Sequence, residues 1–233
     1  MNPRDPNVAK VELIAQALGP LCEELVFVGG CAVGLLMTDP GAGPPRITYD
    51  VDLVIEVASL AGYHRIESEL ERLAFVRDHS KGAPICRWQF GGVAVDMMPS
   101  EERILGFANR WYPRMMREAD RVVLPGGTVI RLVSAPLFVA SKFEAFADRG
   151  AGDLLGSHDL EDIITLIAGR PELAREAAQA DEELRGYLAQ RCARLLAAPG
   201  FMNFLPGMVL QDDTLDERVA VVAERLQLLA SQA

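Results

Sequence analysis

Cysteine and lysine are both scarce in this chain of 233 residues. The four cysteines lie far apart, at Cys22, Cys31, Cys86 and Cys192, and no two of them form a Cys-x-x-Cys pair. This spacing argues against a zinc ribbon and against a disulfide framework, so we expect reduced thiols, as in a cytosolic protein. Lysine occurs only at Lys10, Lys81 and Lys142 against 20 arginines, which makes each lysine worth separate attention.

Long hydrophobic runs and a net positive charge are also missing. The best candidate for a membrane segment, Leu25–Met37, is interrupted by three glycines and is shorter than the roughly 20 residues that cross a bilayer. The N-terminal stretch carries acid and proline where a signal peptide is basic and then apolar. The net charge of −10 disfavours non-specific binding of duplex nucleic acid, but it is compatible with a local basic site. These features predict a soluble, cytoplasmic protein with no membrane partner.

The pattern of apolar residues divides the chain into two halves. Short β-rich runs predict strands at 25–28, 49–57, 85–90, 93–98, 121–124 and 128–132. Helical patterns occur at 8–18, 31–37, 60–73 and 101–118, the last interrupted by Pro113, and then at 135–148, 157–168, 171–197 and 214–230. We therefore predict an α/β (α+β) fold. A small mixed β-sheet flanked by helices forms a core domain of residues 1–133, and an all-helical C-terminal domain of residues 134–233 follows.

Three aspartates stand out in the predicted strands. Asp50 and Asp52 are two residues apart, so both carboxylates leave the same face of the strand, while Val51 and Leu53 point to the opposite face and can anchor it. Asp96 lies among apolar positions of another strand, where a lone acid is costly unless it is paired or metal-bound. If these two strands are neighbours, three carboxylates converge. Oxygen ligands of this kind suit Mg²⁺.

Gly29 and Gly30 stand where a predicted strand turns into a helix. The missing side chains allow a phosphate to approach the backbone, and the start of a helix supplies N–H groups and a positive dipole. A lone Gly-Gly or Asp-x-Asp is usually a turn or a surface feature. The full order of strand, Gly-Gly, helix, loop, Asp-x-Asp strand and later strand acid is much more specific.

This order of motifs resembles the nucleotidyltransferase-fold superfamily, to which DNA polymerase beta belongs. The residues that carry the resemblance are Val28-Gly29-Gly30, Thr48-Tyr49-Asp50-Val51-Asp52 and Val95-Asp96. The resemblance implies that Gly29, Gly30 and Thr48 help to hold a nucleotide. It also implies that divalent ions, Mg²⁺ or alternatively Mn²⁺, are bound by three catalytic acids, Asp50, Asp52 and Asp96.

The second half of the chain narrows the resemblance to the AbiEii/AbiGii-type nucleotidyltransferase toxins. Lys142, Ala145 and Arg149 look like their Lys-x-x-Ala-x-x-x-Arg motif, and the spacing places these residues on one helix face. Asp159 and Asp162 are similar to the acids of the Lys-Asp-x-x-Asp motif that follows, with a histidine in place of its lysine. The resemblance implies nucleotide-binding roles for Lys142, Arg149, Asp159 and Asp162.

Simpler explanations exist for the same residues. Lys142 could be an exposed cation that pairs with Glu144 or Asp148. Asp159 and Asp162 could orient Lys142, could approach the metal site, or could merely favour a helix N-terminus.

A series of arginines provides a candidate surface for nucleic acid. At about 100° per residue these side chains would share one helix face beside Trp111 and Tyr112, which could stack bases. The alternative is an ordinary solvated face. The members of the series are Arg103, Arg110, Arg114, Arg117 and Arg121.

The resemblance implies metal-dependent transfer of a nucleoside monophosphate from an NTP to an acceptor hydroxyl, with release of pyrophosphate. One candidate acceptor is RNA, for example the end of a tRNA, for a toxin-like enzyme with a cognate antitoxin. Another is the hydroxyl of a small molecule such as an antibiotic. The non-enzymatic alternative is a non-catalytic nucleotide-binding module, and the presence of all three acids and Lys142 argues against it.

Overall fold

The computed structural model describes residues 5–150, 153–154 and 156–232, and the chain divides into two compact units. The first, which we call the sheet unit, consists of Pro6–Ala32 and Arg46–Ser134. The second, the helical unit, groups Val33–Pro45 with the described parts of Met1–Asp5 and Ala135–Ala233. The segment Val33–Pro45 thus belongs to the helical unit although it lies within the stretch predicted as the first domain. The division into a core domain of residues 1–133 and a helical domain of residues 134–233 remains a prediction.

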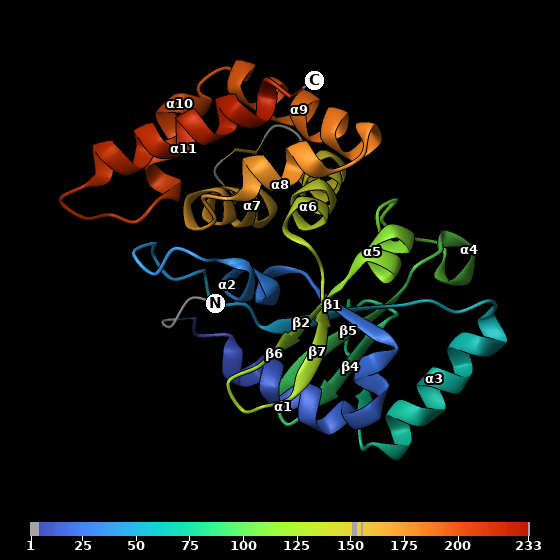
Figure 1. The fold of residues 1–233 in the computed structure, drawn as a ribbon. Coiled ribbons are helices and arrows are strands. Elements are labelled where there is room, and N and C mark those ends of the chain that lie inside the picture. The colour runs from blue at the N-terminus through green and yellow to red at the C-terminus, as the bar shows by residue number, and fades with distance from the viewer. Residues whose placement is uncertain (1–4, 151–152, 155, 233) are drawn as a thin grey trace. The chain divides into compact units, whose positions relative to one another are not determined.

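The sheet unit contains a seven-stranded mixed sheet (Figure 1). Its order is β3-β4-β5-β2-β1-β7-β6, with β2 parallel to β5, β1 parallel to β7, and the other neighbours antiparallel. The predicted mixed sheet with flanking helices and a following helical region is therefore confirmed. The strands are β1 Leu25–Val28, β2 Asp50–Ile55, β3 Val76–Arg77, β4 Arg87–Phe90, β5 Val93–Pro99, β6 Asp120–Val123 and β7 Val129–Leu132.

Two hairpins of the sheet turn at glycine residues. Gly91 and Gly92 connect β4 to β5, and their φ angles of 57° and 81° are the positive values that a tight two-residue hairpin turn requires. The turn between β6 and β7 contains Gly127, which also has a positive φ, of 87°. Because a two-residue turn fixes the register of its strands, the first hairpin determines which residue of β4 faces each residue of β5.

Helices flank the sheet within the same unit. Ser59 caps α3, because its hydroxyl oxygen accepts a hydrogen bond from the backbone N–H of Gly62. Asn7 occupies the N-cap position of α1, but its side chain makes no capping bond. The helical elements of this unit are α1 Val8–Leu18, η1 Gly19–Glu23, η2 Gly30–Ala32, α3 Leu60–Arg72, α4 Glu102–Leu105 and α5 Tyr112–Glu118.

Residues 101–118 do not form the single interrupted helix that their composition predicts. The helix α4 ends at Leu105, and its C-cap residue Gly106 has a left-handed φ of 83°. Pro113 lies in the first turn of α5, where the missing N–H has no intrahelical partner to lose. The idea of one arginine face is therefore wrong, and Trp111 is buried rather than available for stacking. The arginines are spread over α4, the turn before α5, α5 and β6: Arg103, Arg110, Arg114, Arg117 and Arg121.

The helical unit is built around α7. Five apolar side chains of this helix are fully buried, and α2, α6 and α11 pack against it. The helix predicted at 171–197 is two helices, because Asp181 begins a new one by accepting a hydrogen bond from the Leu184 N–H. The elements are α2 Val33–Leu36, α6 Ala135–Gly150, α7 His158–Gly169, α8 Leu173–Gln179, α9 Glu182–Ala197, α10 Phe201–Phe204, η3 Leu205–Met208 and α11 Leu215–Ala230.

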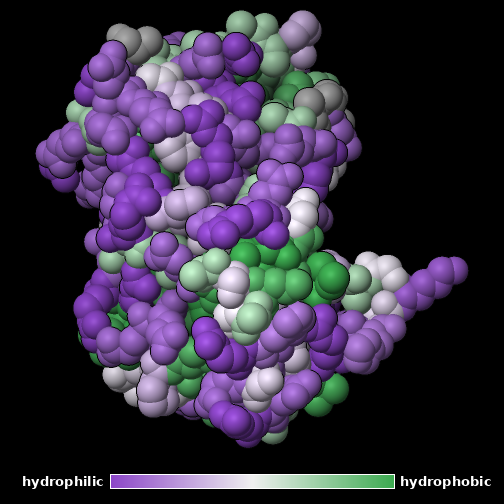
Figure 2. Space-filling view, turned by 90° about the vertical axis from the view of Figure 1, so that its right-hand side faces the viewer, coloured by the Kyte–Doolittle hydropathy of each residue, from purple (hydrophilic) through white to green (hydrophobic). Residues whose placement is uncertain are grey.

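The exposed surface is mostly hydrophilic on the face drawn in Figure 2, with an apolar area in the lower part of that view. Among the described residues, no helix is both long enough and apolar enough to cross a membrane. All four cysteines are buried and free, so the expectation that they form no disulfide is confirmed.

Candidate functional site

One row of facing residues runs across four adjacent strands of the sheet. Arg87 of β4 faces Asp96 of β5, Asp96 faces Asp52 of β2, and Asp52 faces Val28 of β1. Side chains of directly facing residues project from the same side of a sheet. The two aspartate strands are parallel neighbours, so the condition under which the three carboxylates converge is met.

The three acids lie close together on that side of the sheet. Asp50, Asp52 and Asp96 each contribute a carboxylate oxygen, and these three oxygens lie within 4.8 Å of one another. Asp96 is buried and the other two are half-buried. On the opposite face of β2, Val51 and Leu53 are fully buried and anchor the strand, as predicted. Such a set of hard oxygen donors fits a divalent ion such as Mg²⁺.

Arg87 is a member of this site that sequence reasoning missed. Its Nε donates a hydrogen bond to Asp96 Oδ1 at 2.8 Å, and its Nη2 donates to Asp96 Oδ2 at 2.7 Å and to Asp50 Oδ2 at 3.1 Å. The hydrogen bonds to Asp96 raise the pKa of Arg87 above its ordinary value, so the guanidinium stays charged. The signal in the sequence is the Gly91-Gly92 turn, since its register sets Arg87 opposite Asp96.

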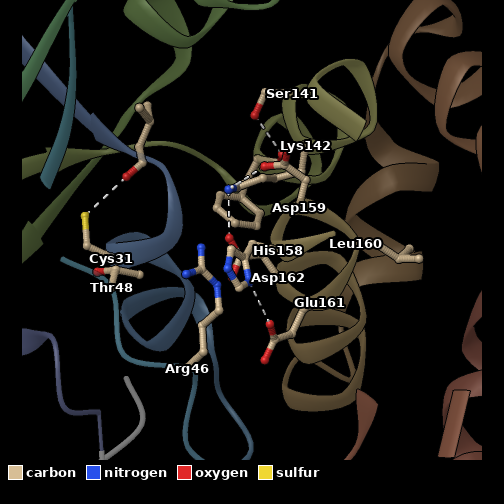
Figure 3. Close-up of polar contacts among 12 residues, drawn as sticks. Cys31, Arg46, Thr48, Ser141, Lys142, His158, Asp159, Leu160, Glu161 and Asp162 are labelled. Carbon is tan, nitrogen blue, oxygen red and sulfur yellow. Dashed lines mark hydrogen bonds and ion pairs between the residues drawn. The ribbon is translucent and has the colours of Figure 1, made fainter. Parts of the chain in front are cut away.

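Gly29 lies directly against one of the acids. A Cβ at this position would overlap the carboxylate of Asp52, and the backbone φ of 68° also favours glycine. Gly30 is buried and begins η2, and the Ala32 N–H donates to the carbonyl of Gly29 at 3.1 Å. The Cys31 thiol donates to the carbonyl of Val28 at 3.3 Å, which closes the same turn (Figure 3). That Gly29 and Gly30 bind a nucleotide stays a prediction.

Thr48 fixes the backbone that leads into β2. Its hydroxyl oxygen lies 3.3 Å from both the Asn7 Oδ1 atom and the carbonyl oxygen of Asp50, and its backbone N–H donates to Asn7 Oδ1 at 3.0 Å. Lys10 adds a contact from its Nζ to the Thr48 carbonyl. With its side chain buried and engaged in this way, Thr48 supports the start of the Asp-x-Asp strand; direct contact with a nucleotide stays a prediction.

A second charged cluster lies within the helical unit. Lys142 of α6 is only 8% exposed, and its ammonium group pairs with Asp159 Oδ1 at 3.0 Å and with Asp162 Oδ2 at 2.7 Å (Figure 3). Arg149, whose side chain is 71% exposed, donates from Nη2 to the other oxygen of Asp159 at 2.9 Å. Two buried carboxylates are thus matched by two cations, which is the condition under which buried charges persist.

This arrangement excludes one of the explanations left open for these residues. The explanation of Lys142 as an exposed cation paired with Glu144 or Asp148 is wrong, because the side chain is buried and its ion pairs are with acids of α7. Asp159 and Asp162 both pair with Lys142, and an orienting role for them stays a prediction. His158, at the position where the resembled motif has lysine, is exposed and lies 3.3 Å from Glu161.

A mixed sheet that gathers three carboxylates beside a strand–Gly-Gly–helix turn is the arrangement of a nucleotidyltransferase. A family described as "Nucleotidyl transferase AbiEii toxin, Type IV TA system" matches residues 12–228. The chain belongs to this AbiEii family of nucleotidyltransferase toxins.

A comparison with solved structures found several chains similar to this one. An antigenic nucleotidyltransferase-like protein from Paracoccidioides brasiliensis is 24% identical, over 83% of this chain and 90% of that one, with a TM-score of 0.49. JHP933 from Helicobacter pylori is 13% identical, over 97% and 92% of the two chains, with a TM-score of 0.45. ANT(2″)-Ia in complex with adenylyl-2″-tobramycin is 18% identical, over 80% and 97%, with a TM-score of 0.44. A comparison with curated protein sequences gave no match.

Proposed function

We propose that this protein transfers a nucleoside monophosphate from an NTP to an acceptor hydroxyl and releases pyrophosphate. The observation that carries the proposal is the convergence of three carboxylate oxygens within 4.8 Å on one side of the sheet. A bound Mg²⁺ or Mn²⁺ would supply charge neutralisation for the phosphates. Asp50, Asp52 and Asp96 would hold the ion.

Asp96 has a second task in this proposal, which is to accept the proton of the acceptor hydroxyl. Both of its oxygens already accept a hydrogen bond from Arg87. Each carboxylate oxygen has a second lone pair, so these bonds leave Asp96 able to accept a further proton or to contact an ion.

The triphosphate is the proposed ligand of Lys142 and Arg149. Lys142 is a compact charge of the kind that binds phosphate, and Asp159 and Asp162 hold it in one orientation. Arg149 is exposed enough to reach an anion while it stays bonded to Asp159. The backbone at Gly29 and Gly30 is the remaining proposed contact, since it allows close approach of a phosphate.

The acceptor that we propose is an RNA hydroxyl, with the end of a tRNA as the leading candidate. The family is one of toxins from toxin–antitoxin systems, and a toxin of this kind must act on a constituent of its own cell. We therefore also propose a cytoplasmic location and a cognate antitoxin. A small-molecule hydroxyl, such as that of an antibiotic, is the alternative outcome of the test below.

The test is an unbiased transfer screen. Purified protein is incubated with Mg²⁺ and each of four α-labelled NTPs, in separate reactions with total RNA and with a pool of small hydroxyl compounds. We expect label in RNA with one or two of the nucleotides, and no label with the Asp52→Asn variant. Label only in small molecules would replace the RNA acceptor. No transfer to either pool, together with intact NTP binding, would favour the non-catalytic module.

A further inference from the structure

The Nη2 nitrogen of Arg87 bridges two members of the acid triad. It lies 2.7 Å from Asp96 Oδ2 and 3.1 Å from Asp50 Oδ2. A divalent ion held by these carboxylates would supply positive charge at the same place. The two bonds differ in kind, because Asp96 is held by two donors of the guanidinium and Asp50 by only one.

Electrostatics explains why a cation is needed there without a metal ion. Three carboxylates whose oxygens lie within 4.8 Å repel one another, and Asp96 is buried, so its charge is poorly solvated. Arg87 offsets part of this repulsion. A divalent ion would have to coordinate carboxylate oxygens at about 2.0–2.1 Å, closer than any hydrogen bond, so it would compete with Nη2 for the same oxygens.

We infer that Arg87 is a positioning residue that stands in for the divalent ion and exchanges with it. In the metal-free protein Arg87 holds Asp50 and Asp96 together. A bound ion would take the place of the single bond from Arg87 to Asp50, and the paired bonds to Asp96 would keep that carboxylate in place. Arg87 therefore lowers the affinity for free metal ions while it keeps the acids arranged for an ion. This inference rests on the proposed function, because it assumes that the triad binds metal.

The competing explanation is a purely structural one, in which Arg87 only clips β4 to β5 through Asp96 and has no relation to metal. Both explanations predict that Arg87→Met lowers the thermal stability of the metal-free protein. They differ in the affinity for metal. Loss of a structural clip would leave metal binding unchanged or weaken it, whereas loss of a competing cation would strengthen it.

The experiment measures Mn²⁺ binding to the full chain without nucleotide, by calorimetry and by the electron paramagnetic resonance signal of free Mn²⁺. Wild type is compared with Arg87→Met and with Arg121→Met. Arg121 is the matched control, since it is also paired with a carboxylate, Glu23, on the sheet unit, and its removal changes the net charge equally. We expect Arg87→Met to bind Mn²⁺ about tenfold more tightly than wild type, and Arg121→Met to bind it within about twofold of wild type.

Arg87→Lys is a second variant in case Arg87→Met does not fold. It keeps the positive charge and loses only the planar guanidinium that donates two hydrogen bonds to Asp96. The Mn²⁺ affinity of Arg87→Lys should lie between those of wild type and Arg87→Met. If Arg87→Met does not fold, Arg87→Lys should still bind Mn²⁺ more tightly than wild type. Equal or weaker Mn²⁺ binding in both Arg87 variants, with binding still abolished by Asp52→Asn, would overturn the inference and leave the metal site standing. If neither wild type nor any Arg87 variant shows Mn²⁺ binding that requires Asp52, this result would instead contradict the proposed function.

Discussion

Gly29 lies against Asp52 so closely that any side chain at position 29 would occupy the space of the Asp52 carboxylate. Gly29 directly follows Val28, the last residue of β1, and Val28 faces Asp52 across the β1–β2 ladder. Glycine is therefore required at position 29 for a structural reason that does not depend on phosphate binding. It leaves room for the carboxylate of Asp52.

Gly29→Ala should impair both folding and metal binding. The positive φ alone costs about 1–2 kcal/mol for alanine, and displacement of Asp52 adds to that and disturbs the triad. Gly127→Ala is the matched control, because Gly127 has a similar φ of 87° and open space around its Cβ position. The control should lose stability without loss of Mn²⁺ binding, measured by chemical denaturation and calorimetry. Equal effects of the two substitutions on Mn²⁺ binding would contradict this account.

Asp52→Asn should stabilise the metal-free protein by up to about 1 kcal/mol, because it removes one of three crowded charges. It should also abolish the increase in melting temperature that Mg²⁺ gives to wild type. Asp50→Asn should abolish the Mg²⁺ response as well, and it also removes the ion pair of Asp50 with Arg87. Thermal melts with and without Mg²⁺ provide the measurement. An unchanged Mg²⁺ response in both variants would show that the ion binds elsewhere.

Lys142→Met should destabilise the protein strongly. From the sequence alone, replacement of Lys142 is expected to leave stability nearly unchanged, but its burial between Asp159 and Asp162 reverses that expectation. Loss of one partner from a buried ion pair costs about 3–5 kcal/mol. Arg149→Met, at an exposed position of the same cluster, should cost no more than about 1 kcal/mol. Similar unfolding free energies for the two variants would contradict the buried cluster.

The cysteines should make the protein sensitive to alkaline pH. Burial raises the pKa of Cys86 and Cys192 to about 12 and that of Cys22 to about 11. Because the unfolded thiols ionise first, near about pH 8.5, stability is fully present below that pH and is lost as the pH rises toward these values. Melting temperatures between pH 7 and pH 10 should therefore fall.

A chemical test accompanies the pH series. At pH 8 a thiol reagent should react slowly with the native protein and should titrate all four cysteines once the chain is unfolded. Rapid reaction of any thiol in the native protein would contradict the burial of these side chains.

Much of the fold and of the acid site could be predicted because both depend on local patterns. Alternation along the strand set Asp50 and Asp52 on one side. That the Asp96 strand is their neighbour was a condition that the sequence left open, and the structure meets it. Arg87 was also within reach, since the Gly91-Gly92 turn fixes its register opposite Asp96.

Other features depend on tertiary contacts that no local pattern encodes. The ion-pair partners of Lys142 come from another helix, so the sequence alone did not decide whether Lys142 is buried or which acids it pairs with. The prediction that the arginines share one helix face was wrong for a different reason. Pro113 is as compatible with the first turn of a helix as with an interruption, and in the structure it lies at the start of α5.

The acid triad should drive nucleotide transfer, and the loss of transfer in an acid variant can be measured directly. Incorporation of α-labelled nucleotide into total RNA is measured with Mg²⁺ for wild type and for Asp52→Asn, after both proteins are shown to melt cooperatively. We predict incorporation by wild type and a loss of at least about a hundredfold in the variant, which keeps the fold and loses a metal ligand. Incorporation by folded Asp52→Asn at the wild-type rate would contradict the account.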